Sequence, residues 1–193
     1  MENSTVKDRI MDVSIKLFAE KGFHGTTTRQ IAAGAQVNEI SIFRNFGSKE
    51  GILREIFVCR LSMIGEKMER ISSYLQYDLL PDMLAVSRHY HEKLSANIDF
   101  VMIIVREFRN GEIFDLYWTL PQKFVKMITA YFEEMKRQGK IKAENTELAA
   151  ITFVTMNFGF FIMKKTFGDR LTSITPEEYI QTSIRSFLEG MLP

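Results

Sequence analysis

The stretch from Thr26 to Lys49, TTTRQIAAGAQVNEISIFRNFGSK, holds two short helical patterns on either side of a four-residue break. Thr27 followed by Gln30 is a capping-box pattern that starts the first helix. The break covers residues 34–37, and Asn38 is a good N-terminal cap for the second helix. Two short helices around a tight turn form a helix-turn-helix, whose second helix can enter the major groove of DNA.

The rest of the chain also carries helical patterns and no strand signal, because β-branched residues never alternate cleanly with polar ones. Pro121 is expected to open a helix, after a short segment at residues 112–119. The sequence therefore predicts an all-α fold. Outside the helix-turn-helix, the patterns predict helices over residues 5–21 and 48–74, from Pro81 onwards, and over residues 98–108, 121–138, 144–167 and 176–189.

The composition changes near residue 50, because all six tyrosines and the single tryptophan, Trp118, follow that point. This change predicts two parts. The first is a three-helix head over residues 5–50, with its pattern extending to about residue 65 through the next helix. The second is a larger helical-bundle body over residues 51–193, rich in adaptable apolar side chains.

The charge of the chain gives little indication of its partners. The formal net charge is +1, and residues 1–50 contain seven basic and six acidic side chains. A head with so little positive charge gains only modest affinity from neutralising phosphates. If DNA is the partner, we therefore expect two subunits to bind together.

Targeting and redox features point to the cytoplasm. The N-terminus is polar and lacks the apolar run of a signal peptide. The apolar run at residues 151–163 is expected to be too short and too polar to span a bilayer, so no membrane association is predicted. The single cysteine, Cys59, cannot form an internal disulfide, which fits a reducing compartment.

Catalytic or metal-binding chemistry finds no support in the sequence. His89 and His91 are two residues apart, so they lie on different helix faces and cannot easily share a metal. Neither a glycine-rich phosphate loop nor a nucleophile elbow is present. We therefore expect a protein that is not an enzyme and has no cofactor.

The helix-turn-helix resembles that of the tetracycline-repressor (TetR) family of bacterial transcription regulators. The resemblance covers about residues 5–60 and implies a regulator, expected to be a repressor, which binds an operator in double-stranded DNA as a homodimer. It also implies a small-molecule effector in the body, and a pocket lined by methionine and phenylalanine there would favour a hydrophobic one. The matching residues are Thr26-Thr27-Thr28, Ile31-Ala32, Ala35-Gln36-Val37-Asn38, Ile42-Phe43, Phe46 and Lys49.

Four residues depart from the family pattern, and one of them, Asn38, replaces a serine and keeps the cap. Gln36 replaces the usual glycine of the turn, which costs roughly 1 kcal/mol if the backbone there is left-handed. Phe43 replaces a tyrosine whose hydroxyl commonly reaches a phosphate, and we expect Phe43 to face inward with Ile42. Ile40 stands where a small residue is common, and it can contact a thymine methyl group.

The DNA candidates keep alternative roles open. Thr27 can cap its helix or offer its hydroxyl and backbone N–H to a phosphate. Arg29 can read a guanine or stay solvated, and Glu39 can accept from a cytosine amino group or face solvent. Lys49 is expected at a phosphate. The full candidate set is Thr27, Thr28, Arg29, Asn38, Glu39, Ile40, Ser41, Phe43, Arg44, Asn45 and Lys49.

Two further sites are expected in the body. The resemblance implies a dimer interface in the last two helices, and the run at residues 151–163, apolar on all sides, supports it. A ligand pocket needs apolar and aromatic walls with a few polar groups. The interface candidates are Phe153, Met156, Asn157, Phe160, Ile184, Phe187 and Leu188; the pocket candidates are Phe100, Met102, Ile103, Arg106, Phe114, Tyr117, Trp118, Phe124 and Met127.

One alternative function stays open. Gln36, Glu39, Phe43 and the near-zero charge of the head also fit a helical protein that binds small molecules or lipids and has lost DNA binding. Binding to the promoter next to its own gene would distinguish the two.

Overall fold

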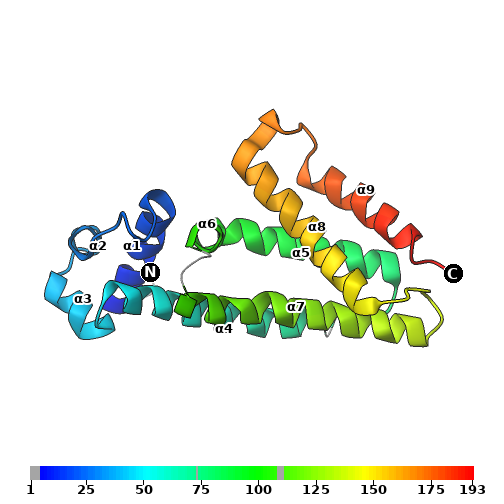
Figure 1. The fold of residues 1–193 in the computed structure, drawn as a ribbon, viewed down its shortest axis with the longest axis horizontal. Coiled ribbons are helices and arrows are strands. Elements are labelled where there is room, and N and C mark those ends of the chain that lie inside the picture. Colours follow the sequence, from blue (N-terminus) through cyan, green and yellow to red (C-terminus); the bar gives the residue numbers. More distant parts are fainter. Residues whose placement is uncertain (1–4, 73, 108–110) are drawn as a thin grey trace. The chain divides into compact units, whose positions relative to one another are not determined.

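Figure 1 shows the computed structural model of the chain, with its α-helices numbered in chain order. The structure describes residues 5–72, 74–107 and 111–193, with no side-chain description for residues 61, 63–72, 107, 111–118 and 120. These ranges contain no β-strand, so the predicted all-α fold is confirmed. The helices are α1 (Val6–Lys21), α2 (Thr28–Ala35), α3 (Glu39–Phe46), α4 (Lys49–Ser72), α5 (Leu79–Ala96), α6 (Ile98–Glu107), α7 (Gly111–Arg137), α8 (Thr146–Phe167), the 3-10 turn η1 (Gly168–Arg170) and α9 (Pro176–Glu189).

Side-chain caps fix where several helices begin. Thr5, Thr27 and Thr175 each accept a hydrogen bond from the backbone N–H three residues on, and that third side chain binds back to the threonine N–H. Asn38 caps α3 and Asn145 caps α8 through a side-chain oxygen. Caps of this kind satisfy backbone donors that a helix leaves open, and those at Thr27 and Asn38 are the caps that the sequence predicts.

Helix α7 differs from the sequence prediction. Pro121 was expected to open a helix, but it lies inside α7, which runs unbroken from Gly111 to Arg137. A proline inside a helix removes one backbone hydrogen bond and costs about 3 kcal/mol. Phe124 and Ile128, in the turns after Pro121, are buried in an apolar core. We attribute the continuation of the helix to this burial, which offsets the local cost.

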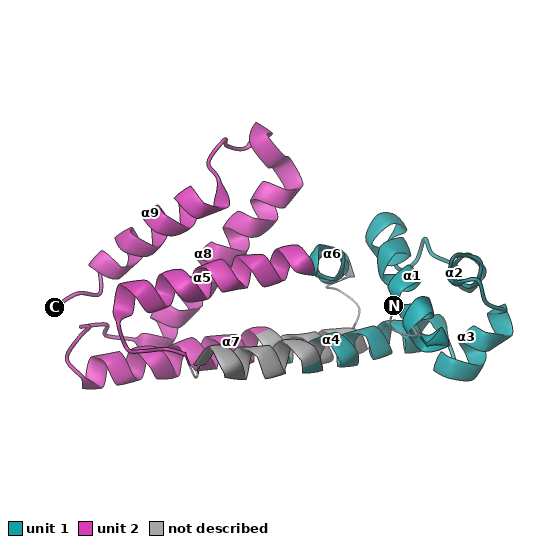
Figure 2. Ribbon diagram, turned by 180° about the vertical axis from the view of Figure 1, so that it is seen from behind, with its two compact units in different colours: residues 1–64, 97–119 teal, residues 65–96, 120–193 magenta. Residues whose placement is uncertain are grey.

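The chain divides into two compact units, which Figure 2 shows in teal and magenta. Unit 1 contains residues 1–64 and 97–119, and unit 2 contains residues 65–96 and 120–193. Unit 1 therefore extends beyond the expected head, since it includes the first part of α4 and helix α6. The functional boundaries expected near residues 50 and 65 stay predictions.

The core of unit 1 collects buried side chains from α1, α2, α3, the first part of α4 and α6. Ile10, Ile31 and Ile42 are fully buried there. Phe57 on α4 and Phe100 on α6 meet edge to face, with ring centroids 5.0 Å apart. Helix α6 is therefore part of the packed support of the helix-turn-helix, although it lies far from it in sequence.

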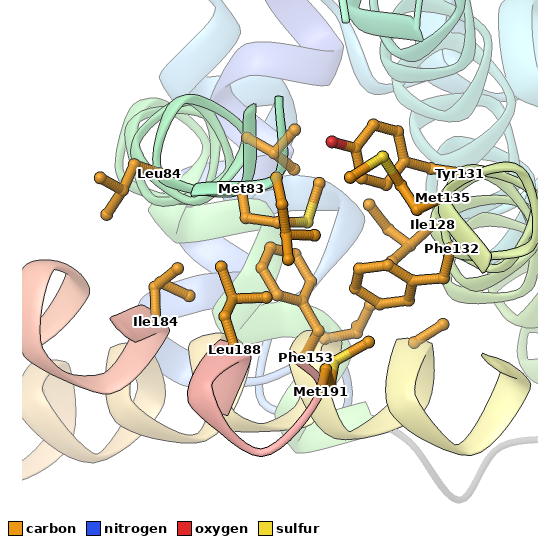
Figure 3. Packing of buried hydrophobic residues seen from close by; sticks show 14 of the residues in the cluster. Met83, Leu84, Ile128, Tyr131, Phe132, Met135, Phe153, Ile184, Leu188 and Met191 are labelled. Carbon is orange, nitrogen blue, oxygen red and sulfur yellow. The ribbon is translucent and has the colours of Figure 1, made fainter. Parts of the chain in front are cut away.

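The core of unit 2 is formed by α5, the C-terminal part of α7, α8 and α9. Figure 3 shows how side chains from these four helices point toward one another. Met83, Ile128, Phe132, Phe153 and Ile184 are completely buried. The inner faces of α8 and α9 are thus occupied by the core of their own subunit.

Helix α8 covers the region where a helix over residues 144–167 was expected, and it is apolar along most of its length. Residues 146–170, a longer stretch than the apolar run at residues 151–163, are long and apolar enough to cross a membrane by length and composition alone, with a mean hydropathy of 1.4. Core helices of soluble proteins pass the same test. Only 28% of its apolar window is buried, and Leu148, Ile151 and Met163 are exposed. This outer face of α8 is a candidate contact surface for a second subunit.

Candidate nucleic-acid interface

The turn between α2 and α3 contains one residue with a left-handed backbone, Gln36. Gln36 adopts a left-handed conformation, with φ 55° and ψ 47°, and its N–H donates to the carbonyl oxygens of Ala32 and Ala33. The N–H of Val37 also donates to the Ala32 carbonyl, at 3.0 Å. An L-residue other than glycine costs about 1 kcal/mol or more in this conformation, so the turn is strained at Gln36.

Helix α3 presents apolar side chains to solvent. Ile42 is fully buried, whereas Ile40 is 71% exposed and Phe43 is 51% exposed. The expectation that Phe43 faces inward is therefore wrong. Successive residues of a helix are rotated by about 100°, so Phe43 turns away from the core when Ile42 fills it. Ile40 and Phe43 are thus placed on the surface that a recognition helix offers to DNA.

A side-chain hydrogen bond joins the starts of α2 and α3. Thr28 Oγ1 donates to Glu39 Oε1 at 2.5 Å, and both residues are partly buried. Asn38, just before Glu39, caps α3 by accepting from the Ile40 N–H at 3.0 Å. The polar N-terminus of the recognition helix is therefore held in a defined conformation.

The remaining polar candidates differ in how far they are engaged. Arg29 and Arg44 are exposed, and neither forms an ion pair within the described ranges. Asn45 donates from Nδ2 to the carbonyl oxygen of Ser41 at 2.6 Å, so its amide is tied to its own helix. The two arginines are therefore the cations of this surface best placed to reach phosphates or base edges.

Thr27 serves its own helix with both of its local groups. Its hydroxyl oxygen accepts from the Gln30 N–H at 3.2 Å, and its backbone N–H donates to Gln30 Oε1 at 3.0 Å. The capping role is thus confirmed, and the backbone N–H is not available to a phosphate. The hydroxyl hydrogen of Thr27 remains as a donor.

Lys49 is bound inside unit 1. Its Nζ donates to the carbonyl oxygens of Phe23 at 2.7 Å and Thr26 at 2.8 Å. An ammonium group has three donors, so one remains for another acceptor. The expected phosphate contact stays a prediction, while the structure assigns Lys49 a second task, which is to close the loop between α1 and α2.

The expected ligand-binding residues are divided between the two units, and the pocket they were expected to form stays a prediction. Phe100 and Ile103 belong to the core of unit 1, whereas Phe124 belongs to the core of unit 2. Arg106 was expected to contact a ligand, but it donates to the carbonyl oxygen of Ala19 on α1. Met102 and Met127 are partly buried. The side chains of Phe114, Tyr117 and Trp118 lie outside the described residues.

The core of unit 2 contains a polar contact that was not predicted from the sequence. His91 Nε2 on α5 lies 3.2 Å from Asn157 Oδ1 on α8, and Asn157 Nδ2 donates to the Phe153 carbonyl at 2.8 Å. Burial lowers the pKa of His91 below its usual value. Ser87, one turn before His91, is fully buried, and its hydroxyl has no hydrogen-bond partner within the described part of the chain. The i, i+4 spacing of Ser87 and His91 in an apolar helix is the sequence signal that indicates this polar strip.

Four of the residues expected at the dimer interface lie instead in the core of their own subunit. Phe153, Asn157, Ile184 and Leu188 are buried in their own subunit and cannot touch a partner. A helix that is apolar on all sides gives no sequence signal of which side faces its own core. Met156, Phe160 and Phe187 are partly buried, and they stay predictions.

These features define a helix-turn-helix protein with a helical body, and comparison with known proteins gives its family. The model described as "Bacterial regulatory proteins, tetR family" matches residues 10–56. The model described as "AefR-like transcriptional repressor, C-terminal domain" matches residues 81–190. The chain is 30% identical over 184 residues to the HTH-type transcriptional regulator YvkB of Bacillus subtilis (strain 168), covering 95% of each protein. The chain therefore belongs to the TetR family of transcriptional regulators.

Solved structures of the same fold include a transcriptional regulator and a protein in complex with operator DNA. The regulator FadR from Bacillus subtilis in complex with stearoyl-CoA has a TM-score of 0.73 at 19% identity, covering 94% of this chain and 97% of that one. AibR in complex with isovaleryl coenzyme A and operator DNA has a TM-score of 0.75 at 19% identity, covering 97% and 100%. The shared fold confirms a helix-turn-helix head with a helical body.

Proposed function

We propose that this TetR-family regulator is a homodimeric repressor that binds an operator in double-stranded DNA and is released by a hydrophobic acyl effector. The observation that carries the proposal is the exposed face of α3. Ile40, Phe43 and Arg44 extend to solvent there. Ile40 and Phe43 are large apolar side chains, which are among those most often buried in proteins. A recognition helix needs such a face, since base edges offer methyl groups as well as hydrogen-bonding groups.

Two heads are needed because one head carries little charge. Residues 1–50 contain seven basic and six acidic side chains. Lys49, one of the seven, already donates to two backbone carbonyl oxygens. Few phosphates can be neutralised by one subunit, so the affinity must come from paired contacts. Paired recognition helices read half-sites about 34 Å apart, or a multiple of that distance.

The outer face of α8 supports the dimer. Leu148, Thr152, Thr155 and Gly159 follow one another at spacings of four, three and four residues, which places them on one side of the helix. Leu148, Thr152 and Thr155 are exposed, and a Cβ atom added at Gly159 would meet nothing within 4 Å. The subunit itself therefore does not require glycine at 159. A partner helix that packs closely against α8 would require it.

An acyl effector is supported by two proteins of this fold. FadR was solved with stearoyl-CoA, and AibR with isovaleryl coenzyme A. In this chain, the Ser87 hydroxyl is buried beside the apolar core of unit 2, and no described residue forms a hydrogen bond with it. Such a group is costly when left unsatisfied, and an acyl carbonyl oxygen would satisfy it. We propose Ser87 as a polar contact of the effector.

A gel-shift assay with the promoter next to its own gene tests this function. The wild-type protein is expected to shift this fragment and to leave an unrelated fragment of equal length unbound. Isovaleryl-CoA and stearoyl-CoA are then titrated against the complex, with coenzyme A as the control. Release by a thioester but not by coenzyme A, weakened in S87A, supports the proposal.

Two results of the same assay oppose the proposal. A complex that survives both thioesters contradicts the acyl effector. If no DNA is bound but thermal melting shows that a thioester binds, the chain is a small-molecule carrier that has lost DNA binding. As a DNA-binding regulator, the protein is proposed to act in the cytoplasm.

A further inference from the structure

An acidic side chain stands at the first position of the recognition helix. Glu39 opens α3, and Thr28, which opens α2, donates from its hydroxyl to Glu39 Oε1 at 2.5 Å. A carboxylate accepts about four hydrogen bonds through its two oxygens. The bond from Thr28 therefore determines which oxygen is held by the protein, and it leaves Oε2 as an acceptor for another molecule.

The charge of Glu39 is not neutralised by a neighbour. Within the described ranges, no lysine, arginine or histidine forms an ion pair with Glu39. A carboxylate beside phosphates would only be repelled by them. Over the base edges of the major groove, however, cytosine N4 and adenine N6 offer hydrogen-bond donors. Glu39 is therefore compatible with DNA only where it faces one of these amino groups.

Large apolar side chains lie beside Glu39. Ile40 is the next residue and Phe43 follows one turn later, and they are 71% and 51% exposed. Because positions i and i+4 share a helix face, Glu39 and Phe43 face the same side of α3. Apolar groups in this position match the methyl group of thymine. The surface of α3 thus combines one acceptor with an apolar contact.

We propose that Glu39 is a specificity-determining residue that selects a cytosine in each half-site, and that Thr28 positions it. This inference rests on the proposed DNA-binding function. Cytosine presents a lone donor in the major groove, whereas adenine places its N7 acceptor beside N6, and that acceptor repels a carboxylate. Guanine and thymine present acceptor atoms to the groove. Thymines beside the cytosine meet Ile40 and Phe43.

Selection of binding sites from a random duplex library tests the inference, with the full-length wild-type protein and three variants. In E39Q, Thr28 still binds the side-chain oxygen, so the amide NH₂ faces the groove as a donor. The preference is then expected to move from cytosine to guanine, whose O6 and N7 accept, by roughly tenfold at that position. T28V releases the carboxylate and is expected to weaken the cytosine preference without replacing it.

E20Q is the matched control, because Glu20 is an exposed acid on α1 and its loss changes the charge of the head equally. It is expected to select the wild-type consensus. Circular dichroism melts show whether each variant is folded. If E39Q is unfolded, the base preference of T28V tests the role of Glu39 instead. If E39Q selects the same consensus as the wild type, the role of Glu39 is overturned but sequence-specific binding is not. The same conclusion follows if E39Q is unfolded and T28V selects the wild-type consensus. A wild-type protein that selects no sequence overturns both.

Discussion

The ammonium group of Lys49 donates to the carbonyl oxygen of Phe23 at 2.7 Å and lies over the ring of the same residue, 4.3 Å from its centroid. This contact ties the start of α4 to the loop that leads into α2. A second bond, to the Thr26 carbonyl, comes directly before the Thr27 cap. The loop that carries the first DNA candidates is therefore held by Lys49, whose charge and position at a helix N-terminus also favour a phosphate.

Replacing Lys49 is expected to destabilise the protein in the absence of DNA. K49M keeps the length of the side chain but removes both hydrogen bonds, at a cost of about 1–3 kcal/mol, because bonds from charged donors are worth more than neutral ones. The free energy of unfolding from urea denaturation measures this loss. K16M, at an exposed lysine of α1, is the control and should change little. An unchanged K49M protein would show that Lys49 has no scaffold role.

Relaxing the strained turn should stabilise the protein. Gln36 holds φ at 55°, so Q36G is expected to raise the free energy of unfolding by about 1 kcal/mol. A33G, at an exposed position inside α2, should lower it by about 0.5–1 kcal/mol, because glycine is unfavourable in a helix. If both variants were destabilised alike, the left-handed conformation at Gln36 would be in doubt.

Local features explain which parts of the fold could be predicted from sequence. The caps at Thr27 and Asn38 depend on residues within one turn, so their pattern is visible in the chain itself. The fate of Pro121 depends on the burial of Phe124 and Ile128, which no local pattern contains. Where burial in the tertiary structure outweighs local helix propensity, the sequence pattern gives the wrong helix boundary.

The candidate sites show the same division. The helix-turn-helix and its exposed start at Glu39 follow from spacing, but the bond to Thr28 joins residues from two different helices. On α8, Phe153 and Ile151 are both apolar, and only packing shows that the first is buried and the second exposed. The sequence therefore predicts the elements of each site better than the side of a helix that serves it.

The outer face of α8 should contain the dimer contact. T155R places a charge in the middle of this face, and a buried unpaired charge is strongly unfavourable, so the dimer is expected to dissociate. S95R, at an exposed serine of α5, is the matched control. Sedimentation velocity measures the mass of each variant at micromolar concentration. A T155R protein that remains dimeric places the interface elsewhere.

The stability of the protein should fall at acidic pH because of His91. Burial lowers the pKa of His91 in the folded state, whereas the unfolded chain binds a proton near pH 6.5. The unfolded state therefore holds more protons as the pH falls below that value, and stability is lost there by at most about 1.4 kcal/mol per pH unit. Between about pH 7.5 and about pH 5.5, H91Q should lose less free energy of unfolding than H24Q. Equal losses in the two variants would contradict the role of His91.

The stoichiometry and footprint of the complex with operator DNA show whether the heads bind as a pair. Sedimentation of the protein with a fluorescent operator duplex gives the number of subunits bound, and footprinting gives the protected bases. We expect an even number of subunits on two symmetric half-sites separated by about 34 Å or a multiple of it. A single subunit on an asymmetric site, bound as tightly by the monomeric T155R variant as by the wild type, would contradict this expectation.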